Sequence, residues 1–167
     1  IKPLPIANVT LPHDVKTVKI AKGARLFNDM DSVVTDFAAE LKGMNAYVLN
    51  SKQQRDSATQ IEFKCETPVH LLVGYFRDDQ MKYAKAPKLE IDATANDYGQ
   101  AEPMITSAII IDGMPQVNLH KYDFNAGSHT LLLPKGMLLV LGYTSGNITQ
   151  RDAGLSGTDK AIDWLFY

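Results

Sequence analysis

The sequence predicts an all-β protein: a two-sheet antiparallel β-sandwich, for which a jelly roll is one arrangement, with one short helical turn. Three observations indicate this fold. The chain has many short β-favouring runs, turn residues separate most of them, and a single brief stretch has helical spacing. We therefore expect sheets formed by hairpins rather than alternating strands and helices.

Two of the short runs, residues 71–75 and 139–143, have nearly the same sequence. Each is apolar, ends in Gly-Tyr and is followed by polar turn residues. Interleaved strands of a sandwich can point the same way, and in that case Tyr75 and Tyr143 meet at one rim. The repeat is too short to indicate a duplication.

The chain of 167 residues is long enough for one domain with a core and too short for two ordinary domains. Residues 1–12 contain three prolines, which favours an extended lead-in or linker, or an edge. Residues 13–167 are expected to form a single sandwich. Because Ile1 is not an initiator methionine, we expect either a processed start or a chain cut from a longer protein.

The first strand is expected within residues 15–21, before a turn at Gly23. Residues 36–43 predict one or two helical turns, with Asp36 as the cap, Phe37 and Leu41 four residues apart, and Gly43 at the end. Apolar alternation then predicts strands at 46–49, 60–65, 69–76, 89–92, 107–111, 117–124, 129–133 and 137–143.

Turn signals at residues 112–115, 125–128 and 134–136 predict consecutive hairpins. Residues 93–99 are expected to form a long exposed loop, where binding residues often lie. Trp164 lies in an apolar segment that is expected to be a final, structural strand.

Composition limits the possible function classes. Hydrophobic residues make up 45% and charged residues 22%, as in a folded globular protein. The net charge is −2 without a run of like charges, which argues against nucleic acid as a partner. No apolar run is long enough for a membrane span. The lone Cys65 is expected to be a buried small hydrophobe.

Enzyme signatures are absent from the sequence. It has no Gly-rich phosphate loop, no His-Glu-x-x-His and no paired cysteines, so we expect neither a catalytic residue nor a cofactor. His70 is expected to face outward, and His120 and Asp123 to lie on opposite faces of a strand. Asp29 and Asp31 could offer oxygen ligands to a structural calcium ion, the alternative being a capped, solvated turn.

Tyrosines beside charged residues favour carbohydrate as the ligand. A sugar ring stacks its C–H face on an aromatic ring, while its hydroxyls need charged or amide partners. The candidate carbohydrate-binding residues are Tyr75, Arg77, Asp78, Tyr83, Tyr98 and Tyr143. The alternative for Tyr75 and Tyr143 is a structural role, with the rings in the core at strand ends.

Residues 23–29, 36–43 and 63–69 resemble β-sandwich modules of secreted bacterial glycan-degrading proteins. The resemblance covers about the middle two thirds of the chain and rests on structural motifs. In such modules the turn Asp-x-Pro-Ala-Glu-Leu-x-Gly usually carries a proline, which Ala38 replaces here. The resemblance implies an accessory or carbohydrate-binding role and an extracytoplasmic location, periplasmic or secreted, and it transfers no catalytic residue.

The leading hypothesis is a non-catalytic β-sandwich module that binds carbohydrate or accompanies a polysaccharide-degrading enzyme. One alternative is a structural or interaction module that packs on a neighbouring catalytic domain. A further alternative is a glycoside hydrolase that uses Asp78 or Asp79 with a distant carboxylate.

Overall fold

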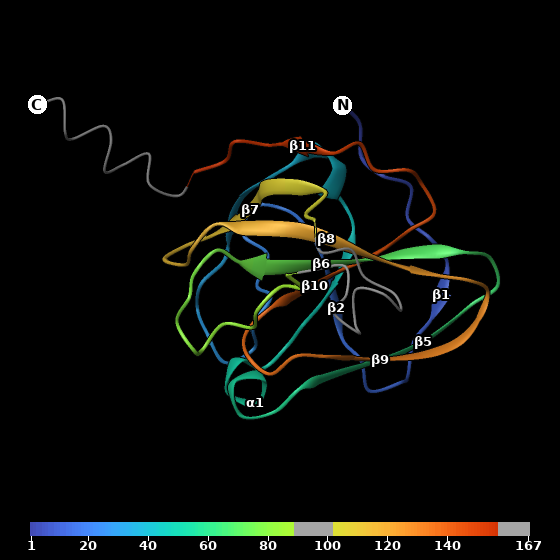
Figure 1. Ribbon diagram of the computed structural model, residues 1–167, viewed down its shortest axis with the longest axis horizontal. Helices are drawn as coiled ribbons and strands as arrows, with labels where there is room; N and C mark the ends of the chain where they lie inside the picture. The colour runs from blue at the N-terminus through green and yellow to red at the C-terminus, as the bar shows by residue number, and fades with distance from the viewer. Residues whose placement is uncertain (89–101, 157–167) are drawn as a thin grey trace, which may run out of the picture.

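The computed structural model describes residues 1–88 and 102–156. Strands dominate this part of the chain, with one short α-helix and one 3₁₀ turn (Figure 1). In chain order the elements are β1 Val9–Thr10, β2 Thr17–Lys19, β3 Val34–Phe37, η1 Ala39–Leu41, β4 Asn45–Tyr47, α1 Ser51–Asp56, β5 Thr59–Cys65, β6 Val69–Phe76, β7 Ile105–Ile111, β8 Val117–Phe124, β9 Gly127–Leu133, β10 Leu139–Thr144 and β11 Arg151–Asp152.

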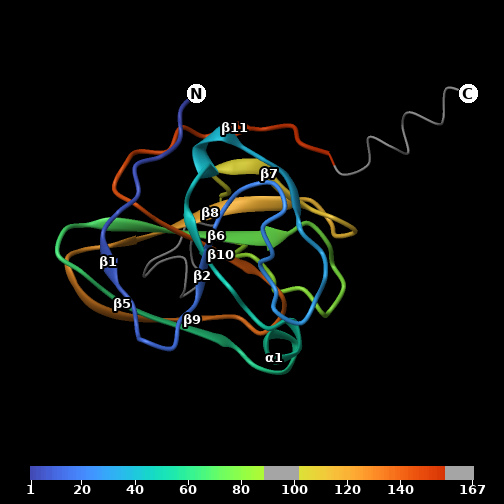
Figure 2. The same cartoon turned by 180° about the vertical axis from the view of Figure 1, so that it is seen from behind.

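The predicted antiparallel β-sandwich is confirmed. A central sheet has the strand order β10-β6-β8-β7-β11, with β3 also paired to β7. A three-stranded sheet, β1-β5-β9, lies on one side of it, and β2 pairs with β4 (Figures 1 and 2). Among the described strand pairs, β11 with β7 is parallel and the others are antiparallel. The short lead-in strand β1 joins an edge of the smaller sheet.

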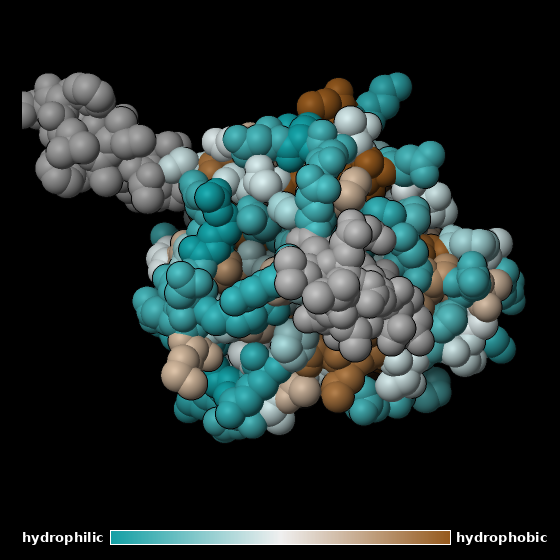
Figure 3. All heavy atoms as spheres, in the orientation of Figure 1, coloured by the Kyte–Doolittle hydropathy of each residue, from teal (hydrophilic) through white to brown (hydrophobic). Residues whose placement is uncertain are grey.

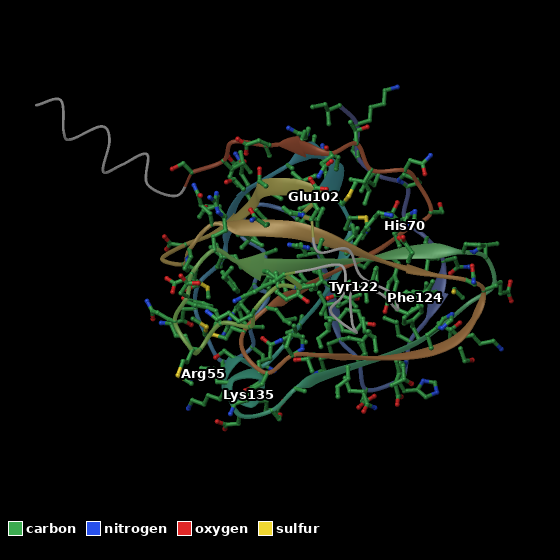
Figure 4. All side chains as sticks on the ribbon, viewed as in Figure 1. Arg55, His70, Glu102, Tyr122, Phe124 and Lys135 are labelled. Atoms are coloured by element: carbon green, nitrogen blue, oxygen red, sulfur yellow. The ribbon has the colours of Figure 1, made fainter. Side chains whose placement is uncertain are left out.

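The core lies on both faces of the central sheet. On β6, Val69, Leu71, Val73 and Tyr75 belong to an apolar cluster shared with β5 and β9. The alternate residue Leu72 belongs to a second cluster, shared with the N-terminal segments. Figure 4 shows Tyr122 and Phe124 on the β9 side of β8 and His70 on the other side. β6 is therefore buried on both faces, between the two apolar clusters.

Most of the predicted strands are confirmed within a few residues, and the limits of β6 and β8 match the prediction. The turn at residues 112–115 joins the antiparallel neighbours β7 and β8, as a hairpin does. The other two predicted hairpins are wrong, since residues 125–128 and 134–136 connect strands of different sheets. The strand expected at 89–92, the loop at 93–99 and the final segment with Trp164 lie outside the described residues.

The predicted helical turn is shorter than expected. It is a 3₁₀ turn over Ala39–Leu41, and Asp36 does not cap it because Asp36 lies in β3. Gly43 follows the turn with φ +77°, a conformation that glycine favours. Ala38 has a φ of −65°, which suits the proline usual in the resembling modules, but its amide donates a hydrogen bond to the Ala108 carbonyl oxygen over 2.7 Å.

The sequence did not predict the helix α1. Its Asn50 cap accepts a hydrogen bond from the Gln53 amide. The Asp29 carboxylate accepts hydrogen bonds from the Ser51 amide and hydroxyl, over 2.8 and 2.6 Å, and from the Lys52 amide. Because Asp29 lies 22 positions before Ser51, no local pattern in the sequence predicts this cap.

The two Gly-Tyr repeats do not point the same way. β6 and β10 are antiparallel neighbours, with Leu139 opposite Gly74 and Tyr143 opposite Leu71. Each glycine has its own steric reason. A Cβ on Gly74 would lie 2.7 Å from Val117 Cγ1 and 3.2 Å from Leu139 Cβ. Gly142 has φ +116° at a register shift in β10, where other residues are strained.

An ion pair joins the chain's later part to the 3₁₀ turn. Arg151 donates two hydrogen bonds to the Glu40 carboxylate, over 2.8 and 2.7 Å. The Glu40 side chain is only 8% exposed. The bonds from Arg151 lower the pKa of Glu40 below its ordinary value, against the effect of burial.

Replacing Glu40 with Gln removes this charge pair. We expect the free energy of unfolding to fall by roughly 1–3 kcal/mol near neutral pH, because the half-buried Arg151 guanidinium loses its charged acceptor. Since the folded pKa lies below the ordinary value of 4.5, the wild-type advantage is complete above that value and disappears as the pH falls through the folded pKa. Urea unfolding of the wild type and the variant at a series of pH values measures this difference in the free energy of unfolding.

The control is Asp31→Asn, which breaks the exposed Arg25–Asp31 pair and should change stability little at any pH. An equal deficit of Glu40→Gln at all pH values would contradict the predicted role of the charge.

Replacing Gly74 with Ala tests the close packing on β6. We expect a loss of roughly 1–3 kcal/mol, measured by urea unfolding, because the new methyl group meets Val117 and Leu139. Val117→Ala removes the nearest contact, so the double variant should lose less stability than the sum of the two single variants. Additive losses would show that the Val117 contact is not the cause.

Candidate functional site

Tyr75 and Tyr143 lie at opposite ends of the β6–β10 pair, so the expected common rim is wrong. Both side chains are buried in the same apolar cluster, at 2% and 4% exposure. Their hydroxyl groups form hydrogen bonds of 2.6 Å to other tyrosine hydroxyls, Tyr75 to Tyr122 and Tyr143 to Tyr47. This arrangement agrees with the structural alternative for both tyrosines.

Burial raises the pKa of both hydroxyls in the Tyr47–Tyr143 pair. It raises the pKa of Tyr47 to about 12, although the hydrogen bond with Tyr143 acts in the opposite direction. It also raises the pKa of Tyr143, and the neighbouring Tyr47 adds to this effect. Both hydroxyls therefore stay protonated near neutral pH and act as a buried hydrogen-bonded pair.

Arg77 and Asp78 line a hollow of about 300 Å³ where β6 ends. We call this hollow the Arg77 groove. Arg77, Asp79 and Lys85 are exposed, and Asp78 is half-buried. Lys85 lies 3.7 Å from the Asp79 carboxylate and donates to the Asp78 carbonyl oxygen over 3.4 Å. Charged side chains of both signs thus share the groove.

The guanidinium of Arg77 is oriented by one side chain from β7 and one from the turn between β7 and β8. Nη1 donates to Ser107 Oγ over 3.2 Å and to Gln116 Oε1 over 3.0 Å. Ser107 has φ +48°, an uncommon value for a residue other than glycine, and its amide donates to Asn118 Oδ1. Backbone strain of this kind is often found at functional sites. No local pattern in the sequence predicts the roles of Ser107 and Gln116, because these roles depend on the pairing of distant strands.

Tyr83 lies beneath this groove rather than on its surface. Its ring is 5% exposed and contacts Phe76, with the ring centroids 4.9 Å apart. Burial raises its pKa, and the nearby negative charge of Asp78 adds to this. Arg77 and Asp78 thus line the groove, whereas the buried Tyr83 does not.

A second hollow, of about 460 Å³, includes Tyr75 and Tyr122 in its lining. Residues 85–88 line both this hollow and the Arg77 groove, which places Tyr75 on the far side of that strip. Tyr98 lies outside the described residues. The five described candidates therefore do not form one continuous site.

The histidines of β6 and β8 contact other side chains of the central sheet. His70 Nδ1 lies 2.6 Å from Asp123 Oδ1, and Lys121 Nζ is within 3.0 Å of both Asp123 oxygens. His120 is buried on the opposite face, where its ring contacts Tyr75 edge-on with centroids 5.2 Å apart. The prediction that His120 and Asp123 lie on opposite faces of a strand is confirmed.

In the described part of the chain, no group of three or more His, Cys, Asp or Glu side chains could hold a metal ion. Asp29 uses its oxygens to cap α1, which matches the capped turn that was the alternative to calcium. Hydrogen bonds from Ser51 and Lys52 outweigh the effect of burial, and the net pKa of Asp29 is lowered.

Sequence reasoning missed a larger hollow of about 650 Å³ beside α1 and the end of β4. Its lining is rich in amide side chains, including Asn28, Asn50, Gln53 and Gln60. No periodic pattern could have found it, because the amides come from three separate segments: Asn28, the start of α1 with Asn50 and Gln53, and β5 with Gln60. We call it the amide cleft.

The face seen in Figure 3 is mainly hydrophilic, with small separate apolar patches. Leu132 of β9 is one of the large apolar side chains that stay exposed, at 62%. None of the described helices has the length and apolar character that a membrane crossing requires.

The Tyr47–Tyr143 pair yields a stability test. Tyr143→Phe leaves the buried Tyr47 hydroxyl without its partner, so we expect a loss of roughly 1–3 kcal/mol in urea unfolding. Tyr47→Phe should have a similar effect, and the double variant should lose less than the sum. Strict additivity would contradict a shared hydrogen bond.

Comparison with known proteins places the chain beside glycan-degrading enzymes. No family model matches the sequence, and no curated protein matches it. Among solved structures it is similar to a GH138 enzyme targeting pectin rhamnogalacturonan II, with 48% identity and a TM-score of 0.89. The match covers all of this chain and 19% of that enzyme.

A more distant likeness indicates the fold alone. A β-glucuronidase from glycoside hydrolase family 2 matches over 86% of this chain and 15% of its own, with 13% identity and a TM-score of 0.53. The predicted resemblance to modules of glycan-degrading proteins is confirmed in part, by the similarity to a region of the GH138 enzyme. The chain is thus related over its whole length to about a fifth of a pectin-targeting enzyme.

Proposed function

We propose that the chain is a non-catalytic β-sandwich module of a glycan-degrading protein and that it contacts carbohydrate at the Arg77 groove. The observation that carries this proposal is the 48% identity over the whole chain to 19% of the GH138 enzyme. A compact sandwich that corresponds to a small part of a large enzyme fits an accessory module. Polysaccharides are too large to cross a membrane intact, which supports an extracytoplasmic location, periplasmic or secreted.

The chemistry of the Arg77 groove suits a sugar with hydroxyl and carboxylate groups. The Arg77 guanidinium offers donors in a fixed plane, and Ser107 and Gln116 hold its orientation. Asp78 can accept hydrogen bonds from sugar hydroxyls, and Lys85 adds a second cation. Pectic polymers contain uronic acids, whose carboxylates pair with guanidinium and ammonium groups. Tyr83 packs against Phe76, which lines the groove.

The acidic residues support a non-catalytic role. Asp78 Oδ1 accepts from the Gln80 amide over 2.7 Å, which is a local turn contact, and the Asp79 side chain is fully exposed. A glycoside hydrolase needs one carboxyl group with a raised pKa as its general acid. Asp29, Glu40 and Asp152 each have a lowered pKa instead.

A second candidate function is packing against a neighbouring catalytic domain. The matched GH138 enzyme is about five times as long as the region that this chain covers. The hollow beside Tyr75 is lined by Pro87, Pro134 and the exposed Leu132, which suits an apolar contact. Leu132→Asp in the full-length protein should then weaken the interface without changing glycan binding by the isolated module.

The carbohydrate proposal is tested by titrating the purified chain with acidic and neutral pectic oligosaccharides in a calorimeter. Arg77→Ala should weaken binding of the acidic oligosaccharides roughly ten- to hundredfold, because a charge-assisted hydrogen bond is lost. Gln116→Ala should weaken it less, since Arg77 keeps its charge and loses only one orienting partner.

Arg55→Ala is the matched control, because Arg55 is an exposed arginine on α1 outside the groove lining. It should bind as the wild type does. Wild-type affinity in Arg77→Ala, or no binding to any oligosaccharide of the panel, would overturn the proposed site.

A further inference from the structure

The amide cleft is separate from the Arg77 groove. It lies between the loop before β2, the end of β4, the helix α1 and the start of β5. Its volume of about 650 Å³ is in the range of small-molecule sites. None of the described carbohydrate-binding candidates predicted from the sequence lines it.

The lining of the cleft combines amides with an apolar floor. The half-buried Val48 and Leu49 and the buried Ile61 supply the apolar part. The amides of Asn28, Asn50, Gln53 and Gln60 supply both donors and acceptors, and hydroxyls come from Ser57 and Thr59. A ligand with an apolar face and a rim of hydroxyl groups matches this lining.

The charges in the cleft favour a neutral ligand. Asp14 and Lys16 are its charged lining residues, and their opposite signs leave no net charge. A carboxylate or phosphate ligand would meet one ammonium group and an opposing carboxylate. A divalent cation would find one carboxylate, whereas hard cations prefer several oxygen ligands.

Several amides are held in fixed positions before any ligand arrives. Asn50 Nδ2 donates to Asn28 Oδ1, and Asn50 Oδ1 accepts from the Gln53 amide, both over 3.0 Å. Gln54 Nε2 donates to Thr59 Oγ1, and its Oε1 accepts from the Leu138 amide. Such contacts reduce the entropy that ordering would cost on binding.

Other polar groups of the cleft are left for a ligand. Within residues 1–88 and 102–156, the side-chain amide of Gln53 and the Nδ2 of Asn28 have no protein hydrogen-bond partner. Both side chains are exposed at the cleft lining. A sugar hydroxyl can donate to and accept from such groups at the same time.

We infer that the amide cleft binds a neutral oligosaccharide segment, with Gln53 and Asn28 contacting its hydroxyls. The choice of sugar as the ligand class rests on the proposed function, while the site is independent of the Arg77 groove. The chain then holds a glycan at two places of different chemistry, one charged and one neutral.

The experiment follows the side-chain amide signals of Asn28 and Gln53 by NMR in the intact chain. The probes are neutral tetrasaccharides of galactose, arabinose and rhamnose units, with a galacturonate trisaccharide as the acidic comparison. We expect at least one neutral probe to shift these signals at millimolar concentration and the acidic probe to leave them unchanged. No shift with any neutral probe would overturn the inference.

Variants then separate the two sites. Gln53→Ala should weaken binding of the neutral probe about three- to tenfold, and Gln53→Trp should block its binding by filling the cleft. Gln53 is exposed, so both variants should remain folded, which circular dichroism checks. Lys52→Ala, one residue away on α1, is the matched control and should bind normally.

Arg77→Ala should leave binding of the neutral probe unchanged. Neutral binding that depends on Arg77 and not on Gln53 would overturn the cleft while supporting the groove. Neutral binding that depends on Gln53 supports the cleft even if Arg77→Ala leaves acidic binding unaffected, so the two proposals fail separately.

Discussion

The rest of the structure depends on the burial of β6 on both of its faces. β8 and β10 pair with its two edges, which satisfies its backbone groups inside the protein. One face packs on the β1-β5-β9 sheet and the other on the N-terminal segments. A strand in this position allows little space, and Gly74 is the residue where even a methyl group does not fit.

This constraint explains the two tyrosine pairs. A Tyr ring adds apolar area to a crowded layer, but its hydroxyl needs a partner when it is buried. Tyr75 with Tyr122 and Tyr143 with Tyr47 meet this need at opposite ends of one cluster. The tyrosines that look most like sugar contacts in the sequence are thus part of the core. Polar side chains outside this core line the Arg77 groove and the amide cleft.

Both hollows form where strands leave the sandwich. The Arg77 groove follows the end of β6, and its orienting residues Ser107 and Gln116 come from β7 and the turn after it. The amide cleft follows the end of β4, where Asn50 and Asp29 cap the helix α1. Polar groups are thus fixed at the ends of a rigid sandwich, where loops on such a scaffold often carry functional residues. The similarity to part of a pectin-targeting enzyme agrees with this arrangement.

The sequence by itself determined the class of fold and most of the strands, because alternation with a period of two is a local property that burial of one face imposes. It also brought Arg77 and Asp78 together, since they are adjacent in the chain. Only the tertiary structure decided the direction of β10 against β6, the sheet to which β9 belongs, and the partners of Tyr75 and Tyr143. The helix cap from Asp29, the Glu40–Arg151 pair and the amide cleft also join distant segments. Such contacts depend on how the sheets stack, and no local pattern encodes them.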